Sequence, residues 1–191
     1  MKLCFATNNN NKLNEVRALL SNSFDLVGLK DIGFEQELAE DHSTIEENSE
    51  QKAEFIYNNF RINCFADDTG LEVFALNLDP GVRSAMYAGP QRSDIDNISL
   101  LLKNLEGKQE RSAQFKTVIT LLLQGQLHRF TGIVKGSIAH ERRGAHGFGY
   151  DPIFIPEGYN VTFAEMALQE KNQISHRARA INQLTEFLKH C

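Results

Sequence analysis

The apolar residues of this chain follow two spacings, one typical of β-strands and one typical of amphipathic helices. A short apolar run from Lys2 to Ala6 predicts a strand. Five later runs rich in apolar and β-branched residues predict further strands: Asn63 to Ala66, Leu71 to Ala75, Gln114 to Leu123, Leu127 to Val134 and Ile153 to Ile155. Only Gln124-Gly125-Gln126 separates two of these runs, so we expect a β-hairpin there.

Polar capping residues mark where the helices begin. Four helices are expected: one capped by Asn9 or Asn10, one opened by the capping box Thr44 to Glu47 and reaching about Phe60, one capped by Ser93 or Asp94 and running to about Leu105, and one starting near Ser175. The apolar residues expected to face the core are Leu13, Val16, Leu19 and Leu20 in the first helix and Ala178, Ile181, Leu184 and Leu188 in the last. Thr162 to Glu165 repeats the capping-box pattern.

The mixed order of strands and helices, with a hairpin in the centre, predicts an α/β fold of the mixed α+β kind rather than a regular doubly wound sheet. The chain has 191 residues and no internal repeat, low-complexity tract or linker, so we expect one domain over residues 1–191. Hydrophobic residues make up 41% and charged residues 24%, which is the composition of a globular protein rather than a disordered one.

Charge and cysteine content exclude several classes of protein. The formal net charge of −5 argues against a general nucleic-acid-binding protein, but a few lysines can still neutralise the phosphates of a nucleotide. No segment approaches the ~18 apolar residues of a membrane span, and the first apolar run is too short for a signal peptide. Cys4, Cys64 and Cys191 are widely spaced and show no zinc pattern, so we expect buried, reduced thiols in a cytoplasmic protein.

A first polar cluster, Thr7-Asn8-Asn9-Asn10-Asn11-Lys12, follows the first predicted strand and opens the first helix. Such a strand–loop–helix unit presents free backbone N–H groups and the positive end of a helix dipole, which suit a phosphate. The threonine and asparagines add side-chain donors, and Lys12 adds a full positive charge. The glycines of a Walker A loop are missing. Taken alone, such a cluster is more often a capped turn than a phosphate site.

A second cluster, Asp67-Asp68-Thr69-Gly70, is expected to form an acidic turn between two short strands. Because successive strand residues point to opposite faces, only one of the two aspartates should face a given site. Carboxylate oxygens suit Mg²⁺, which usually takes one or two protein carboxylates together with phosphate oxygens and waters. Glu40 or Asp41 can supply a second carboxylate. A turn without a metal explains the aspartate pair equally well.

Lys52 lies on the inward stripe of the second predicted helix, four residues before Ile56. A lysine in that position must either extend to the surface or meet an anion, and extension to the surface is the commoner outcome.

A third cluster, Gly147-Phe148-Gly149-Tyr150-Asp151, precedes a predicted strand rather than a helix, which excludes a dinucleotide-binding fingerprint. Gly149 would let a flat base approach the backbone while the Phe148 ring stacks on it. Asp151 can accept a hydrogen bond from a base or a sugar. A glycine-rich turn that buries Phe148 and Tyr150 is the equally weighted alternative.

Ser175-His176-Arg177 opens the last predicted helix. Cations in the first turn of a helix oppose its dipole, so His176 and Arg177 gain most by facing an acceptor elsewhere. Without further context, an exposed pair with no function is the commoner case.

The clusters together resemble the inosine triphosphate pyrophosphatase family, whose members hydrolyse non-standard purine nucleoside triphosphates. The matching stretches span almost the whole length in family order: FATNNNNKLNEV, FADDTGLEV, PGVRSAMYAG, GFGYDPIF and EKNQISHRARA. The resemblance implies a two-lobed α/β fold around a long mixed sheet, with the active site in the cleft and usually a homodimer. It implies hydrolysis of ITP, dITP or XTP to the monophosphate and pyrophosphate with Mg²⁺.

By matching positions, the resemblance also implies a role for individual residues. Asp68 would be the catalytic proton acceptor and would hold the metal together with Glu40. The substrate-binding positions would be Thr7, Asn8, Asn9, Asn10, Asn11, Lys12, Lys52, Thr69, Phe148, Gly149, Tyr150, Asp151, Lys171, His176 and Arg177. Two positions depart from the family pattern: Asn8 stands where the family often has glycine, and Met86 stands where an arginine is expected.

Base selection and two rival functions complete the expectations. Arg177 has only donors and His176 can be a donor, so together they would satisfy the 6-oxo group of ITP and oppose the 6-amino group of ATP. We therefore expect strong selectivity for ITP over ATP. The sequence does not decide whether the protein also discriminates against GTP. The rivals are a related pyrophosphatase acting on pyrimidine or modified nucleotides and a nucleotide-binding sensor without turnover.

Overall fold

The computed structural model describes residues 2–20 and 24–191. Their strands and α-helices are, in chain order, β1 (Lys2–Phe5), α1 (Asn10–Leu20), β2 (Asp25–Gly28), α2 (Ile45–Phe60), β3 (Cys64–Val73), β4 (Pro80–Gly81), α3 (Asp94–Asn104), β5 (Ser112–Leu123), β6 (Gln126–Ile138), β7 (Phe154–Pro156), α4 (Leu168–Ile174) and α5 (His176–Leu188). Short 3₁₀ turns occur at Lys30–Ile32, Phe74–Leu76, Ser84–Met86, Asp151–Ile153 and Phe163–Glu165.

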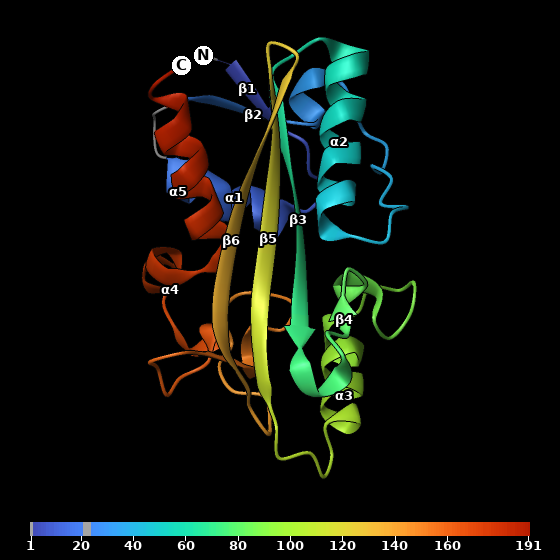
Figure 1. The fold of residues 1–191 in the computed structure, drawn as a ribbon, viewed down its shortest axis with the longest axis vertical. Helices are drawn as coiled ribbons and strands as arrows, with labels where there is room; N and C mark the ends of the chain where they lie inside the picture. The colour runs from blue at the N-terminus through green and yellow to red at the C-terminus, as the bar shows by residue number, and fades with distance from the viewer. Residues whose placement is uncertain (1, 21–23) are drawn as a thin grey trace. The chain divides into compact units, whose positions relative to one another are not determined.

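The strands form one mixed sheet in which β3, β5 and β6 are the long central members (Figure 1). The strand order is β2-β1-β3-β5-β6-β7, and β4 pairs with β3 off this path. β1 pairs in parallel with both β2 and β3, whereas β4 runs antiparallel to β3 and β7 antiparallel to β6. The predicted α/β fold with a mixed sheet is therefore confirmed.

The predicted hairpin is also confirmed, with longer strands than the sequence indicated. β5 begins at Ser112 and β6 reaches Ile138, and the two strands are neighbours in the sheet. Gln124 and Gly125 connect them with φ values of 52° and 83°. Two successive left-handed residues match the right-handed twist of the strands on either side of a two-residue loop.

The described chain divides into two compact units, each with a hydrophobic core. The first unit contains the residues up to Asp68, Thr117–Gly132 and Arg177–Cys191, and the second contains Thr69–Lys116 and Ile133–His176. The single domain expected over residues 1–191 stays a prediction.

In the first unit, α1 and α5 cover one face of the sheet and α2 covers the other (Figure 1). The alternation of strand side chains sets this arrangement. Phe5 and Phe65 point toward α1 and α5, and their rings stack with centroids 4.6 Å apart. Cys4 and Cys64 point to the opposite face and pack with α2.

Side-chain caps fix the starts of three helices as the sequence predicts. The Asn9 carboxamide oxygen accepts from the backbone N–H of Asn11 at 2.9 Å, Thr44 accepts from Glu47, and Ser93 accepts from Asp96. The expected inward residues of α5 are all buried: Ala178, Ile181, Leu184 and Leu188.

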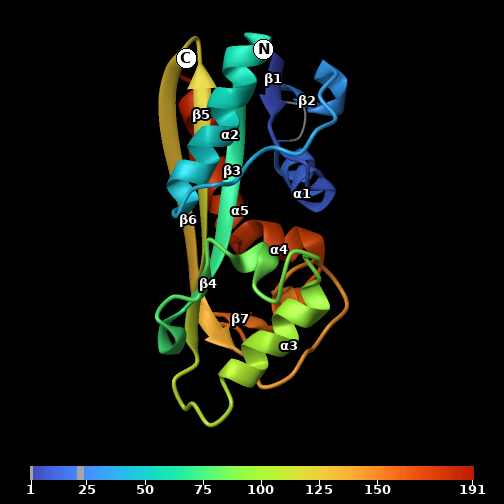
Figure 2. The same cartoon turned by 90° about the vertical axis from the view of Figure 1, so that its right-hand side faces the viewer.

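The second unit contains α3 and β7 (Figure 2). Their buried side chains belong to one core that includes several aromatic rings. Phe115 and Phe154 have ring centroids 4.7 Å apart, and Phe163 packs against both. The predicted capping box at Thr162 is present, but it caps the start of the 3₁₀ turn Phe163–Glu165. The helix α4 begins separately at Leu168.

The two short strands predicted around an acidic turn are wrong. β3 runs without interruption from Cys64 to Val73, so Asp67 and Asp68 lie in mid-strand. Both carboxylates are buried, with 1% and 6% exposure, and both lie beside cationic side chains. Acidic residues can occupy a central strand when counter-charges meet them, and residue types in a short window do not reveal those partners. The strand β2 was not predicted either.

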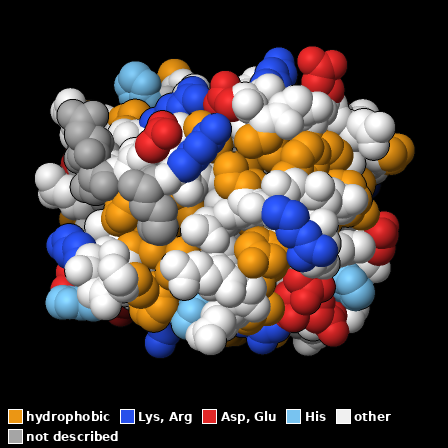
Figure 3. All heavy atoms as spheres, turned by 90° about the horizontal axis from the view of Figure 1, so that it is seen from above, with side chains coloured by type: hydrophobic (Ala, Val, Ile, Leu, Met, Phe, Trp, Pro, Cys, Tyr) orange, Lys and Arg blue, Asp and Glu red, His pale blue; other side chains and the backbone are white. Residues whose placement is uncertain are grey.

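On the face shown in Figure 3, hydrophobic side chains lie among basic and acidic ones, and several acidic side chains gather at its lower right. Within residues 2–20 and 24–191, no helix is long and apolar enough to cross a membrane.

Candidate active site

The loop from Thr7 to Asn9 connects β1 to α1 and is held by its own side chains. The Thr7 hydroxyl accepts from the backbone N–H of Asn9 at 3.2 Å, and Asn9 in turn caps α1. The side chains of Asn9, Asn10 and Asn11 are exposed at the start of this helix. The loop therefore has the strand–loop–helix geometry expected of a phosphate-binding loop.

The side chain of Asn8, expected to contact phosphate, instead bonds to the backbone of another segment of the chain. Its side-chain oxygen accepts from the backbone N–H of Leu38, and its amide nitrogen donates to the carbonyl of Gln36, both at 2.9 Å. The carboxamide therefore ties the loop to the acidic segment that carries Glu40.

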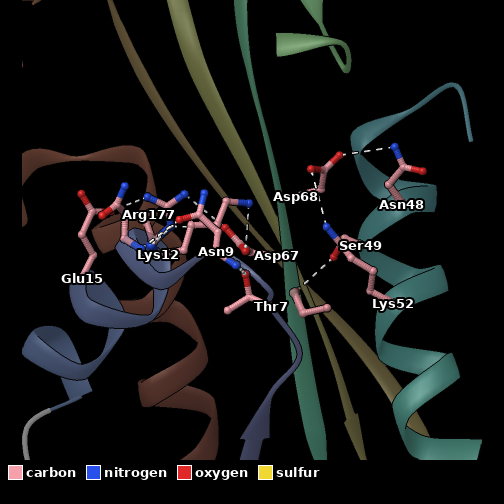
Figure 4. A network of polar contacts seen from close by, with 12 residues as sticks. Thr7, Asn9, Lys12, Glu15, Asn48, Ser49, Lys52, Asp67, Asp68 and Arg177 are labelled. Atoms are coloured by element: carbon pink, nitrogen blue, oxygen red, sulfur yellow. Dashed lines mark hydrogen bonds and ion pairs between the residues drawn. The ribbon is translucent and has the colours of Figure 1, made fainter. Parts of the chain in front are cut away.

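Asp67 faces α1 and α5 and is surrounded by cations (Figure 4). Lys12 donates to its Oδ1 at 3.1 Å, and Nε and Nη2 of Arg177 each lie 3.2 Å from its Oδ2. A third guanidinium nitrogen, Nη1, donates to Glu15. Burial alone would raise the pKa of Asp67, but the charges of Lys12, Arg177 and Lys52 outweigh it and lower the pKa to about 2.

Asp68 points to the opposite side of β3, toward α2, as the alternation of strand residues predicts (Figure 4). Its Oδ1 lies 3.7 Å from Nζ of Lys52, and its Oδ2 accepts from the Asn48 amide at 3.5 Å. Burial raises the pKa of Asp68, Lys52 counteracts that effect, and the negative charge of Glu40 adds to it. The net shift is upward, which makes this carboxylate the more basic of the adjacent pair.

Lys52 does not extend to the surface, because its ammonium meets carboxylates inside the first unit. The residue is 5% exposed and forms ion pairs with Glu40 and Asp68. Burial alone would lower the pKa of Lys52, but Asp68, Glu40 and Asp67 raise it above its usual value. The lysine is therefore a stable cation at neutral pH.

Of the two acidic residues left open as a second metal ligand, the structure brings Glu40 to Asp68. Both carboxylates contact the same ammonium group of Lys52. The exposed Asp41 instead accepts from the side chain of Gln51 at 3.2 Å.

The donor set around Lys52 fits Mg²⁺. Glu40 and Asp68 offer hard carboxylate oxygens, and among the described residues no group of three or more His, Cys, Asp or Glu could hold a metal by itself. Mg²⁺ typically binds one or two protein carboxylates and completes its shell with phosphate oxygens and waters. A cation held partly by the substrate is what such a pair would accommodate.

In the second unit, the glycine cluster forms a turn organised by Asp151. Its Oδ2 accepts from the backbone N–H of Phe148 at 3.0 Å and from Nζ of Lys171 at 2.6 Å. Gly147 has φ of 74°, and a Cβ there would lie 2.0 Å from the Asp151 carboxylate. Lys171 also lies 5.2 Å from the centre of the Phe148 ring. Asp151 was expected to bind the base or the sugar. In the structure its carboxylate instead stabilises the turn and binds Lys171.

Tyr150 and Gly149 are fixed by residues that the sequence did not single out for this role. The Tyr150 hydroxyl donates to the carbonyl of Ser84 at 2.9 Å, and burial raises its pKa. The backbone N–H of Gly149 donates to Asp94 at 2.7 Å. Asp94 was considered only as a helix cap, because the local pattern gave no sign of a contact so distant in sequence. Phe148 itself is partly exposed.

His176 and Arg177 are both buried, so the exposed pair considered for them is wrong. The His176 ring stacks on Phe115 with centroids 4.5 Å apart, within the second unit. Arg177 is bound to Asp67 and Glu15 in the first unit. Their proposed reading of the base edge stays a prediction.

Thr69 is partly exposed, and Met86, at the second departure from the family pattern, is 40% exposed.

Sequence reasoning missed Glu15 and Asn48, which hold Arg177 and Asp68 respectively. A signal for Asn48 was present, because it lies one helical turn before Lys52 on the inward side of α2. No comparable signal existed for Glu15, whose partner is 162 residues away.

Known proteins resemble this chain over nearly its whole length. The family model described as Ham1 family matches residues 3–187. The dITP/XTP pyrophosphatase of Flavobacterium johnsoniae is 50% identical over 98% of both chains, and that of Bacillus subtilis is 41% identical over 96% of this chain and 95% of its own.

Solved structures agree. The Ham1 protein of Staphylococcus aureus has a TM-score of 0.90 and 39% identity over 100% of this chain and 99% of its own. That of Coxiella burnetii has a TM-score of 0.92 and 36% identity over 100% of both chains. These likenesses, joined to the acidic pair on β3 and the capped loop after β1, show that the chain belongs to the Ham1 family.

Proposed function

We propose that this protein hydrolyses non-standard purine nucleoside triphosphates (ITP, dITP and XTP) to the monophosphate and pyrophosphate. The observation that carries the proposal is the convergence of Glu40 and Asp68 on Lys52. Two carboxylates and a buried ammonium provide metal ligands, a proton acceptor and a phosphate-binding cation in one place. The activity named for its dITP/XTP pyrophosphatase relatives supports the same chemistry.

Asp68 is the residue best suited to accept the proton of an attacking water. Its pKa is raised, chiefly by burial, so the ionised form is a stronger base than an exposed aspartate. The water oxygen attacks the α-phosphorus, the bond from this phosphorus to the bridging oxygen breaks, and pyrophosphate leaves with the bond electrons. The water proton passes to Asp68 and then to solvent.

Cations and backbone donors in the first unit would hold the phosphates. Lys52 is a permanent cation, and the start of α1 presents N–H groups with Lys12 in its first turn. Phosphoryl transfer needs little covalent help from a protein, so positioning and charge stabilisation do most of the work.

Mg²⁺ is the cofactor that the donor set favours, with Glu40 and Asp68 as its protein ligands. When bound, it would neutralise charge on the phosphate oxygens and lower the pKa of a bound water.

The base is proposed to stack on Phe148 of the second unit, and the family resemblance makes His176 and Arg177 the proposed donors toward a 6-oxo group. A site built from donors would satisfy inosine and xanthine and leave the amino group of adenine facing another donor. The partly exposed Phe148 ring, fixed by the hydrogen bond from its backbone to Asp151, supports a stacking role.

The decisive experiment measures pyrophosphate release from a panel of purine and pyrimidine triphosphates with and without Mg²⁺. We expect pyrophosphate and monophosphate from ITP, dITP and XTP, and strong selectivity over ATP. Diphosphate plus orthophosphate as primary products would refute the bond assignment. Preferred hydrolysis of a pyrimidine nucleotide would support the first rival, and tight binding without turnover would support the sensor.

We extend the proposal to a cytoplasmic homodimer. All three cysteines are free thiols, which fits a reducing compartment. Cys4 and Cys64 are buried as expected, whereas Cys191 is exposed, so its expected burial is wrong. The second unit exposes large apolar side chains that a second copy of the chain could cover, namely Phe74, Leu78, Met86 and Ile95. Light scattering coupled to gel filtration should give twice the chain mass, and a monomer mass at micromolar concentration would contradict the dimer.

A further inference from the structure

Glu40 lies in a segment that has no regular secondary structure, between the 3₁₀ turn Lys30–Ile32 and α2. No sheet or helix ladder fixes the backbone here, so other contacts must hold it in place. The position of Glu40 matters because its carboxylate would share a metal with Asp68.

Asn8 holds this segment two residues before Glu40. Its side-chain oxygen accepts from the N–H of Leu38 and its amide nitrogen donates to the carbonyl of Gln36, each at 2.9 Å. Leu38 is itself buried, with 8% exposure. The carboxamide thus pairs with the backbone as another peptide group would, through one donor and one acceptor.

Asn48 holds the same segment two residues after Glu40. Its side-chain oxygen accepts from the N–H of His42 at 2.9 Å, and its amide nitrogen lies 3.4 Å from the His42 carbonyl. The same amide nitrogen lies 3.5 Å from Oδ2 of Asp68. Asn48 is 2% exposed, so it is a buried link between the segment and the carboxylate on β3.

Lys52 completes the arrangement one helical turn after Asn48, because it binds Glu40 directly and lies 3.7 Å from Asp68. Two negative carboxylates repel each other before a metal arrives, and the lysine offsets only part of that repulsion. Lys52 holds the carboxylate of Glu40, whereas Asn8 and Asn48 hold the backbone on either side of it.

We propose that Asn8 and Asn48 are positioning residues that hold the backbone on either side of Glu40, so that its carboxylate stands ready beside Asp68 for a divalent cation. This inference rests on the proposed function, because it takes Glu40 and Asp68 as the metal ligands. It assigns Asn8 to the support of a metal ligand rather than to side-chain binding of phosphate. Residues that orient metal ligands typically change metal affinity or activity by ~10- to 100-fold when they are removed.

The test uses the full-length protein and Mn²⁺ alone as the probe. Free Mn²⁺ is measured by its electron paramagnetic resonance signal in titrations of the wild type, Asn8→Ala and Asn48→Ala. Asn59→Ala is the matched control, because Asn59 is an exposed asparagine of α2 whose amide donates to the carbonyl of Phe55. We expect the dissociation constant for Mn²⁺ to rise ~10-fold in both test variants and to stay unchanged in the control.

Hydrogen exchange tests the contacts themselves without a metal. Exchange at the amide of Leu38 should accelerate in Asn8→Ala, and exchange at His42 should accelerate in Asn48→Ala. Because Asn8 is exposed, its variant keeps the test valid if the buried Asn48 variant fails to fold. The Mg²⁺ concentration for half-maximal pyrophosphate release should rise in parallel with the Mn²⁺ constant.

Mn²⁺ affinity within twofold of the wild type in Asn8→Ala would overturn the inference, and so would unchanged exchange at Leu38. A wild type that releases pyrophosphate while its variants bind Mn²⁺ normally would refute only the positioning role. A wild type that neither binds Mn²⁺ nor releases pyrophosphate would instead refute the proposed function and, with it, the metal pair.

Discussion

Asp67 and Asp68 are the same residue type at adjacent positions of β3, yet they belong to opposite faces of the sheet with different chemistry. Asp67 lies with Lys12 and Arg177 beneath α1 and α5, and its pKa is lowered to about 2. Asp68 lies with Glu40 and Lys52 beside α2, and its pKa is raised. Both side chains are buried, so burial alone does not separate them.

The balance of neighbouring charge is what differs. Asp67 and Glu15 together meet two cations, Lys12 and Arg177, whereas Asp68 and Glu40 share the single lysine Lys52. A carboxylate whose charge is matched by neighbouring cations is a stable structural anion, and an under-compensated one retains affinity for a proton or a metal. Asp67 itself is therefore suited to stabilising the fold, and Asp68 is suited to binding a proton or a metal.

The largest expected effect is on stability and concerns Asp67. Replacing it with asparagine removes the charge that Lys12 and Arg177 meet and leaves buried cations under-compensated. We expect Asp67→Asn to lower the free energy of unfolding by about 3 kcal/mol. Urea denaturation measures this, with Asp25→Asn as control because Asp25 is exposed on β2. A loss below about 1 kcal/mol would contradict a structural role for Asp67.

The next effect is on turnover and concerns Asp68. Asp68→Asn keeps the shape but removes the carboxylate proposed to accept the proton and to bind the metal, so kcat should fall at least ~10²-fold. Stability should be unchanged or higher, because the raised pKa means that the folded protein disfavours the charged form. Near-wild-type kcat would remove Asp68 from the mechanism.

Glu40→Gln should mainly raise the Mg²⁺ concentration required for activity.

Acid titration separates the two aspartates by the sign of their pKa shifts. The folded pKa of Asp67 lies below its unfolded value of 3.8, so its stabilisation is complete above that pH and is lost as pH falls toward 2. This amounts to a loss on the order of 2 kcal/mol. Stability curves of the wild type and Asp67→Asn should converge as pH approaches 2. A constant difference over that range would contradict the assigned pKa.

The smallest effect concerns selectivity and tests whether the Asp67 face is purely structural. If Arg177 also reads the base, Arg177→Ala should lower kcat/KM for ITP much more than for ATP and narrow their ratio by ~10-fold or more. Asp67→Asn is the control, since it disturbs the same ion pairs without removing the guanidinium. An unchanged ITP-to-ATP ratio in Arg177→Ala would show that the base edge is read elsewhere.

Local patterns in the sequence correctly predicted those features whose physical cause lies within a few neighbouring residues. Asn9, Thr44 and Ser93 cap helices because their side chains reach N–H groups two or three residues away, and a short window contains both partners. The inward face of α5 and the hairpin turn at Gln124-Gly125 follow from periodicity and turn chemistry in the same way. Strand alternation also correctly predicted that Asp67 and Asp68 face opposite sides.

The sequence by itself determined these elements, the mixed α/β class and the clusters proposed to form the active site. Only the tertiary structure decided that β3 continues through Asp67 and Asp68, because the cations that compensate them come from distant helices. It also placed Glu40 rather than Asp41 on the ammonium group that Asp68 contacts, and it directed Asn8 to Leu38 rather than leaving its amide free for phosphate. These outcomes depend on electrostatic and hydrogen-bond partners far apart in the chain, which no spacing rule encodes.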